Sequence, residues 1–255
     1  MGRLSIVETS NDPEWKKAFN KHLALELESP QQFATCVLST VDANGHPSAR
    51  LVTPRGFVGE DFLRLSPEDA NEWTSDVMTF CTHSKSIKVQ ELVGVSDVQL
   101  LYWFPHAKVQ VRCSGQAHML FHPDNPNYST LSLDIRQRIW RRDDTTAELD
   151  NSEVKLDTEF IREQAYLNHS PMIQAWYAWP PPGRVRSGDE SLYPKEIPQI
   201  KDEEAREKYG SEARRNYVLV FVDVMKVDIV DLKDNTRKLY KRRGDTTWSV
   251  TNINP

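Results

Sequence analysis

Strand-forming segments crowd the first half of the chain, and their spacing limits the folds open to it. Six stretches rich in β-branched and aromatic residues follow one another, at 34–41, 47–54, 62–65, 77–82, 98–104 and 109–120. Residues 84–93 read as a short helix with hydroxyl residues at its start. Strands this close together pair with their neighbours, so the pattern predicts an antiparallel β-barrel or sandwich.

The turn between the first two strands carries the strongest local signal. Asn44-Gly45 separates them, and this dipeptide suits a hairpin turn in which both central residues have positive φ. Before the strands, Asp12-Pro13-Glu14 leads into apolar residues spaced three to four apart, which predicts an opening helix. Asp12 is expected to cap this helix and Pro13 to occupy its first position.

The second half of the chain changes character and then returns to strands. Helices are predicted over 132–142 and 157–168, and the proline run 180–182 ends this helical region. Residues 183–215 are polar, which indicates a long surface excursion or partial disorder. Strands return at 217–224, 226–232, 238–240 and 248–250, and we expect them to complete the early set. The chain is therefore expected to be one domain over 1–255, with a helical insertion at about 121–215.

Charge and composition exclude several classes of protein. The chain has 255 residues and a net charge of −5, which argues against a dedicated nucleic-acid binder. It lacks an apolar run of roughly 18 residues and a signal peptide, so we expect no membrane partner. Cys36, Cys81 and Cys113 lie in strand-like stretches, and buried reduced thiols indicate a cytoplasmic protein. The histidines are scattered without a ligand pattern, so no metal site is expected.

The sequence contains no phosphate-loop, dinucleotide-binding or nucleophile-elbow motif. Three features remain as candidates for a binding site. The first is Arg50 on a strand, with Arg55 just past its end. The second is the helix start that contains Lys88, because a helix N-terminus with nearby cations forms a phosphate site. The third is Gln110 in a strand, together with Arg237 late in the chain. Each alone has an ordinary alternative as a surface or edge-strand side chain.

In this order, these residues resemble the pyridoxamine 5'-phosphate oxidase-like superfamily of FMN-binding split β-barrels. The likeness covers the opening helix and the segments 38–54, 80–92, 102–105, 109–115, 174–183, 237–240 and 248–255. It is closest to a branch of uncharacterised flavin-binding proteins. The resemblance implies a mainly β (α+β) fold, an antiparallel split β-barrel that binds FMN, with a helical insertion and flanking helices. It also implies a homodimer with flavin at the subunit interface.

Residue by residue, the resemblance assigns one set to the flavin and a smaller set to substrate. The flavin set is Arg50, Leu51, Val52, Thr53, Cys81, Thr82, Ser86, Ile87, Lys88, Gln110 and Arg237. Cys81 replaces a tyrosine of the family, and Ile87 replaces an arginine that holds the FMN phosphate. Arg55 matches a lysine at the substrate phosphate, and Tyr166 and Ser170 are partial matches there.

The resemblance implies an FMN-dependent oxidoreductase for a small-molecule substrate that the sequence does not identify. Lys233 and Asn235 stand where the vitamin B6 oxidase has its substrate-binding Arg-x-His pair, and no catalytic residue is assigned. One alternative is a genuine pyridoxamine/pyridoxine 5'-phosphate oxidase. Others are a non-catalytic flavin-binding or storage module, and a split barrel that binds haem or a deazaflavin.

Overall fold

The first hairpin starts the sheet, and its loop differs from the predicted turn. The computed structural model describes residues 9–28, 35–128, 135–142, 154–244 and 247–255. β1 (Cys36–Val41) pairs antiparallel with β2 (Pro47–Val52). Gly45 has a φ of 85°, but Asn44 does not share a positive φ. The Asp42 carboxylate instead accepts hydrogen bonds from the backbone N–H groups of Asn44 and His46, which stabilises a longer loop.

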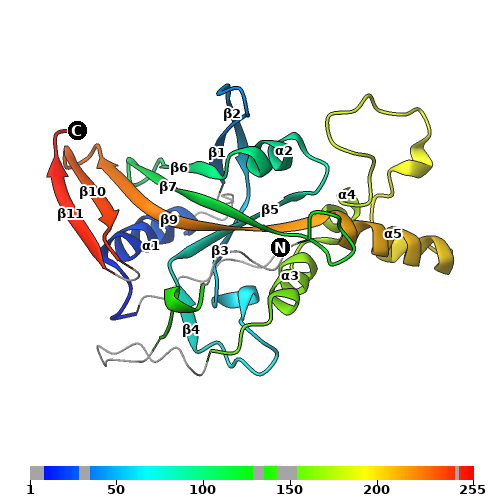
Figure 1. Ribbon diagram of the computed structural model, residues 1–255, viewed down its shortest axis with the longest axis horizontal. Coiled ribbons are helices and arrows are strands. Elements are labelled where there is room, and N and C mark those ends of the chain that lie inside the picture. The colour runs from blue at the N-terminus through cyan, green and yellow to red at the C-terminus, as the bar shows by residue number, and fades with distance from the viewer. Residues whose placement is uncertain (1–8, 29–34, 129–134, 143–153, 245–246) are drawn as a thin grey trace.

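The remaining strands extend this hairpin into one curled antiparallel sheet. Its order is β11-β10-β9-β7-β6-β1-β2, while β5 also pairs with β9 and β3 pairs with β5. The bounds are β3 (Pro54–Phe57), β5 (Val77–His83), β6 (Asp97–Phe104), β7 (Val109–Leu120), β9 (Tyr217–Asp231), β10 (Thr236–Arg242) and β11 (Trp248–Ile253). A separate pair joins β4 (Trp73–Ser75) to β8 (Ile139–Arg141). The predicted antiparallel fold class is confirmed, and the late strands join the early ones as expected (Figure 1).

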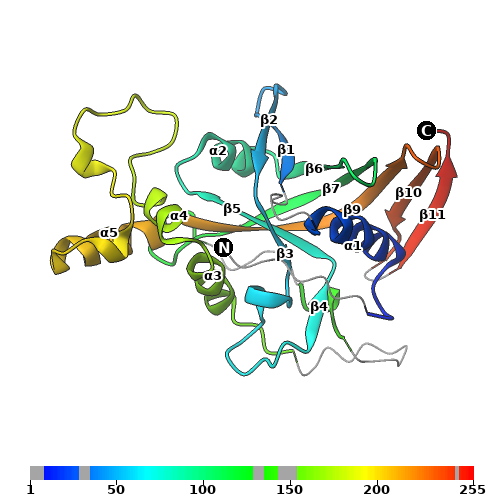
Figure 2. The same ribbon diagram turned by 180° about the vertical axis from the view of Figure 1, so that it is seen from behind.

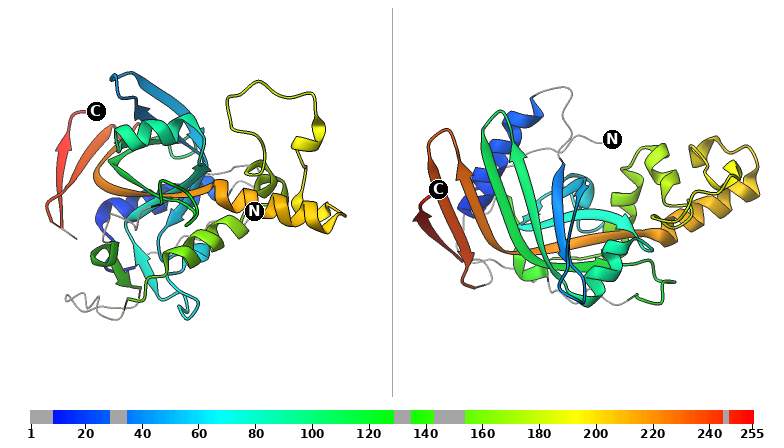
Figure 3. Two further views of the ribbon diagram at one scale, coloured as in Figure 1. Left: turned by 45° about the vertical axis from the view of Figure 1, so that its right-hand side comes forward. Right: turned by 90° about the horizontal axis from the view of Figure 1, so that it is seen from above.

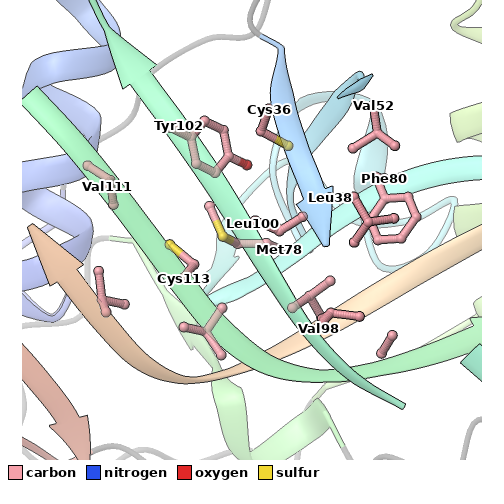
Figure 4. Close-up of a cluster of buried hydrophobic side chains, with 14 of the residues drawn as sticks. Cys36, Leu38, Val52, Met78, Phe80, Val98, Leu100, Tyr102, Val111 and Cys113 are labelled. Atoms are coloured by element: carbon pink, nitrogen blue, oxygen red, sulfur yellow. The ribbon is translucent and has the colours of Figure 1, made fainter. Parts of the chain in front are cut away.

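β9 contributes side chains to two hydrophobic cores because apolar residues occupy both of its faces. Val218, Val220 and Val222 face the core enclosed by the sheet, which β1, β5, β6 and β7 also line (Figure 4). Tyr217, Leu219 and Phe221 alternate with them and face a second core under the helical segment. Alternation places successive side chains on opposite faces, so a strand buried on both sides reads as a continuous apolar run.

Helices cover the sheet at three places. α1 (Glu14–Leu27) buries Trp15, Phe19 and Leu23 and lies across the sheet (Figure 2). α2 (Ile87–Gly94) lies beside β1 and β2, as the two views of Figure 3 show. α3 (Thr158–Leu167), α4 (Pro171–Trp176) and α5 (Glu203–Asn216) gather at the beginning of β9. Within the described ranges, no helix combines the length and apolar character needed to cross a bilayer.

Several predicted elements were wrong. Residues 62–65 do not form a strand, since a 3-10 turn spans Asp61–Leu63. The helix predicted over 132–142 is a 3-10 turn (Ile135–Arg138) followed by β8, and residues 132–134 lie outside the described ranges. Buried ion pairs from Arg138 to Asp76 and Asp223 hold this segment against the sheet.

Other differences concern helix ends and one missed helix. Pro13 is the N-cap of α1, and the Asp12 carboxylate accepts from Lys16 Nζ at 3.0 Å instead of capping. The polar excursion contains α5, which sequence patterning missed because this helix has no apolar stripe. The two strands expected at 217–232 are one strand, β9, with a bulge opposite Ser114 and Gly115.

Candidate cofactor site

A lysine and two hydroxyl groups meet where β5 ends and α2 begins. Lys88 Nζ donates to Thr82 Oγ1 at 3.1 Å, and Thr82 Oγ1 lies 3.0 Å from Ser86 Oγ. Ser86 is the N-cap residue of α2, but its side chain does not cap the helix. The first turn of α2 therefore adds N–H groups without a side-chain partner to the same place.

Arg50 reaches this place from β2 and is held by an acidic residue that sequence reasoning missed. Arg50 Nη2 donates to Glu91 Oε2 at 2.8 Å, and Arg50 Nη1 donates to Thr40. Glu91 also accepts from Ser48 Oγ at 2.9 Å and from Thr40 Oγ1 at 2.5 Å. Glu91 lies three residues after Lys88 on α2, so the two residues share one face of the helix. This spacing was the signal in the sequence that could have identified Glu91 as part of the site.

The electrostatics of this place concern Lys88 and Glu91. Burial lowers the pKa of Lys88, and the charge of Arg50 lowers this pKa further. Among the described residues, no carboxylate forms an ion pair with Lys88. Burial opposes ionisation of Glu91, but hydrogen bonds from Thr40 and Ser48 and the charge of Arg50 hold its pKa below the usual value. We call Arg50, Thr82, Ser86 and Lys88, with the start of α2, the cation–hydroxyl cradle.

Gln110 and Arg237 form a second group on the other face of the sheet. Gln110 pairs with Val230, which pairs with Arg237, so both side chains belong to one row across β7, β9 and β10, roughly 10 Å apart. Arg50 instead pairs with Leu38, a core residue, and so points to the inner face. The structure therefore does not bring Gln110 and Arg237 to the cradle within one chain.

An acidic residue fixes Arg237 on this outer face. Asp228 Oδ1 and Oδ2 accept from Arg237 Nε at 3.0 Å and Nη2 at 2.9 Å. Arg112 Nη2 also donates to Asp228 Oδ2 at 2.8 Å. Asp228 thus links two arginines, and neither Arg112 nor Asp228 was predicted from the sequence.

The other predicted flavin residues differ in how far they are exposed to solvent. Leu51 alternates with Arg50 and is 69% exposed on the outer face, and Ile87 is 68% exposed at the start of α2. Val52 is buried in the sheet-enclosed core. Thr53 is half-buried between β2 and β3.

Cys81 lies beside the cradle in a cluster of aromatic and cationic side chains. His169 Nε2 and Tyr177 Oη each lie 3.3 Å from Cys81 Sγ. Arg55 is 3% exposed, and its charge reaches both Cys81 and His169. We call Arg55, Cys81, His169, Tyr177 and Tyr217 the Cys81 cluster.

Burial in this region lowers the pKa values of two histidines, and this makes the stability of the fold sensitive to acid. Burial and the charge of Arg55 lower the pKa of His169 to about 3, and burial and Lys85 lower the pKa of His83 to about 4. Both are neutral when folded, and the unfolded chain binds more protons below its histidine pKa of about 6.5. Stability is therefore complete above about pH 6.5 and falls as the pH decreases towards the folded pKa values.

We predict that His169→Gln removes part of this acid sensitivity. Because of His169, the free energy of unfolding of the wild type is expected to fall by about 2 kcal/mol when the pH is lowered from about 6.5 to about 4.5. Urea unfolding at the two pH values measures the change. The matched control is His46→Gln, since the side chain of His46 is 79% exposed. An equal acid response in His169→Gln and wild type would contradict the prediction.

Known proteins that are similar to this chain are named for one family. Residues 12–121 match the family described as pyridoxamine 5'-phosphate oxidase, FMN-binding domain. Pyridoxine/pyridoxamine 5'-phosphate oxidase from Nostoc sp. is 30% identical over 127 residues, covering 49% of this chain and 50% of that protein. Pyridoxine/pyridoxamine 5'-phosphate oxidase 2 from Arabidopsis thaliana is 22% identical over 91% of this chain and 93% of that protein. The chain thus spans about half the length of the Nostoc relative.

A solved structure shows the same fold. A pyridoxamine 5'-phosphate oxidase-related, FMN binding protein from Nostoc punctiforme has a TM-score of 0.64 and 22% identity, covering 96% of this chain and 99% of that one. The likeness extends over nearly the whole chain and concerns the antiparallel sheet and its connections. Residues 12–121, less than half of the chain, are similar to the FMN-binding domain of the pyridoxamine 5'-phosphate oxidase family, and FMN is the cofactor that this match indicates.

The donor set of the cradle fits the phosphate of FMN. A lysine without a carboxylate partner in the described ranges, two hydroxyls and uncapped helix N–H groups suit a dianion. Glu91 offsets one positive charge, and Ile87 contributes none. Arg50 and Lys88 are therefore the residues that would supply charge to the phosphate, while Thr82 and Ser86 would supply hydroxyl donors.

Proposed function

We propose that the protein is an FMN-dependent oxidoreductase acting on a small molecule. The observation that carries this proposal is the cation–hydroxyl cradle, where the positive charge of Arg50 acts on Lys88 and lowers its pKa. FMN, when bound, supplies the electron-transfer chemistry, and the protein supplies binding and orientation. Free thiols at Cys36, Cys81 and Cys113 support a cytoplasmic location. β9 packs against both cores, which supports a single domain with 121–215 as an insertion.

We also propose that two copies of the chain complete the site. Leu51, Val37 and Leu101 form one row on the outer face of the sheet, and Trp103 lies beside Gln110 on that face. Leu51 is 69% and Trp103 is 50% exposed, and exposed apolar groups of this kind mark contact surfaces. A second copy packed on this face would bring its own Gln110 and Arg237 towards β2, the strand at the end of the sheet order from which Arg50 reaches the cradle.

Leu51→Glu is predicted to break this dimer. A charge placed in the centre of an apolar interface leaves a desolvated group without a partner, which costs several kcal/mol. Light scattering after size exclusion should give twice the mass of one chain for the wild type and one chain for Leu51→Glu. Val185→Glu is the control, because Val185 is 99% exposed and lies in the segment between α4 and α5, outside the sheet. A monomeric wild type would contradict the proposal, as would a Leu51→Glu variant that stays dimeric.

Reduction of the bound flavin tests the reaction. FMN-loaded protein is mixed without oxygen with pyridoxamine 5'-phosphate, pyridoxine 5'-phosphate or NADPH, and loss of flavin absorbance is followed. Bleaching by the B6 phosphates would identify the activity named for the relatives from Nostoc sp. and Arabidopsis thaliana. Bleaching by NADPH alone would indicate a reductase. A protein that binds FMN but is reduced by none of a broad set of donors would favour the storage module and oppose the proposal.

A further inference from the structure

Arg55 is a buried cation without an acidic partner among the described residues. Its Nη2 donates to Asn168 Oδ1 at 3.0 Å and to the carbonyl oxygen of Ala165 at 3.4 Å, and its guanidinium stacks 4.3 Å from the centre of the Phe62 ring. Its Nε is buried and makes no hydrogen bond. A buried charge that only neutral groups accompany is costly, so this arginine is suited to an anionic ligand.

His169 offers a second donor beside Arg55. The Tyr177 hydroxyl donates to the Cys81 sulfur, and the thiol proton can point to Nε2 of His169. In that arrangement the ring proton of the neutral imidazole is on Nδ1, which is buried and has no hydrogen-bond partner. Cys81 and Asn168 are partly exposed, so the cluster reaches the surface through these two residues.

Within the Cys81 cluster, Arg55 is the one charged side chain, while the charges of Lys88 and Arg162 reach Cys81 and Tyr217 from outside the cluster. Burial lowers the pKa of His169 to about 3, raises the pKa of Cys81, and raises the pKa values of Tyr177 and Tyr217 well above the usual tyrosine value. All four are neutral near pH 7. One positive charge can neutralise a single negative charge, whereas a buried dianion would remain half uncompensated.

The residues expected to bind a substrate phosphate are not available. The side chain of Tyr166 is 1% exposed and packs between the rings of Tyr177 and Tyr217. Ser170 caps α4, and its hydroxyl oxygen accepts from the N–H of Ile173. Of the three predicted substrate residues, Arg55 is the one with a buried N–H group that lacks a hydrogen-bond partner.

We propose that the Cys81 cluster binds a singly charged carboxylate on the substrate, with Arg55 and His169 Nδ1 as its donors. This inference rests on the proposed flavin function, since the cluster adjoins the cradle along β5. Arginine suits a planar carboxylate because its N–H groups lie in one plane. A phosphate ester would be the poorer ligand of this site.

The test uses small anions, whose size makes the unknown shape of the substrate unimportant. FMN-loaded wild type is titrated with acetate and with inorganic phosphate at about pH 8, where phosphate is a dianion, and chloride balances the ionic strength. Isothermal titration and the thermal midpoint report binding. We expect acetate to bind at least about ten times more tightly than phosphate. Arg55→Met should abolish the acetate effect, and Arg55→Lys should keep part of it.

The control variant is Arg64→Met. Arg64 also stacks on a phenylalanine, Phe160, and hydrogen-bonds an amide and a carbonyl, so it matches Arg55 outside the Cys81 cluster. It should leave acetate binding unchanged. Phosphate binding that equals or exceeds acetate binding would overturn the inference, as would acetate binding that survives in Arg55→Met. If Arg55→Met fails to fold, the comparison of the two anions on wild type still decides. FMN affinity, measured separately, shows whether the flavin function stands when the inference fails.

Discussion

FMN binding should weaken about 100-fold or more when Arg50 and Lys88 are both replaced by alanine, since each charge-assisted hydrogen bond contributes about 1.5–3 kcal/mol. Lys88→Ala removes a cation that has no acidic partner in the described ranges, so its effect reports on the phosphate alone. Arg50→Ala adds a second cost, because Glu91 then faces the phosphate without its partner. Quenching of flavin fluorescence during titration of flavin-free protein measures the dissociation constants.

Lys85→Ala is the matched control for this pair. Lys85 lies in the same turn, but its ammonium pairs with Glu212 at 3.6 Å and its side chain is 54% exposed. This variant should bind FMN like the wild type. An Arg50→Ala plus Lys88→Ala protein that stays yellow with unchanged affinity would remove the main support for the cradle. Equal losses of FMN affinity in Lys85→Ala and in the double variant would remove this support as well.

Gly115→Ala is expected to destabilise the fold by about 3 kcal/mol or more, a large share of the 5–15 kcal/mol typical of a domain. Gly115 lies in β7 opposite the bulge of β9, where the two backbones approach closely. A Cβ at this position would lie 2.0 Å from the carbonyl oxygen of Asp223 and 2.8 Å from its carbonyl carbon. Backbone must therefore move, and Asp223 also holds Arg138 and Arg242 in ion pairs.

Gly94→Ala is the control for the added methyl group. A Cβ there would have Ala43 Cβ at 3.9 Å as its nearest neighbour, which is ordinary contact. Alanine is also favoured over glycine in a helix. Urea unfolding should therefore show little change or a small gain for Gly94→Ala. A Gly115→Ala protein as stable as Gly94→Ala would show that the close approach at the bulge is relaxed in solution.

The sequence anticipated the cradle better than it anticipated the substrate region. The hydroxyl and lysine pattern at the start of α2 is local, so residues 82–88 could be assigned to one place from their order alone. Arg50 was also anticipated, through the family resemblance. Glu91 was missed because its role depends on contact with β1 and β2, and Tyr166 was given a substrate role although it packs inside the second core.

The amino-acid sequence by itself determined the long strands of the sheet, the helices α1, α2 and α3 and the resemblance to one family, because alternation, turn residues and motif order act over short stretches of chain. Tertiary structure decided which charges have partners. Arg50 meets Glu91 across 41 residues, and Cys81 meets His169 across 88. Strand register likewise placed Gln110 and Arg237 on the face opposite Arg50. Burial and pairing of a charge depend on contacts between distant segments, and these contacts set whether a cation binds a carboxylate of the protein or stays available for a ligand.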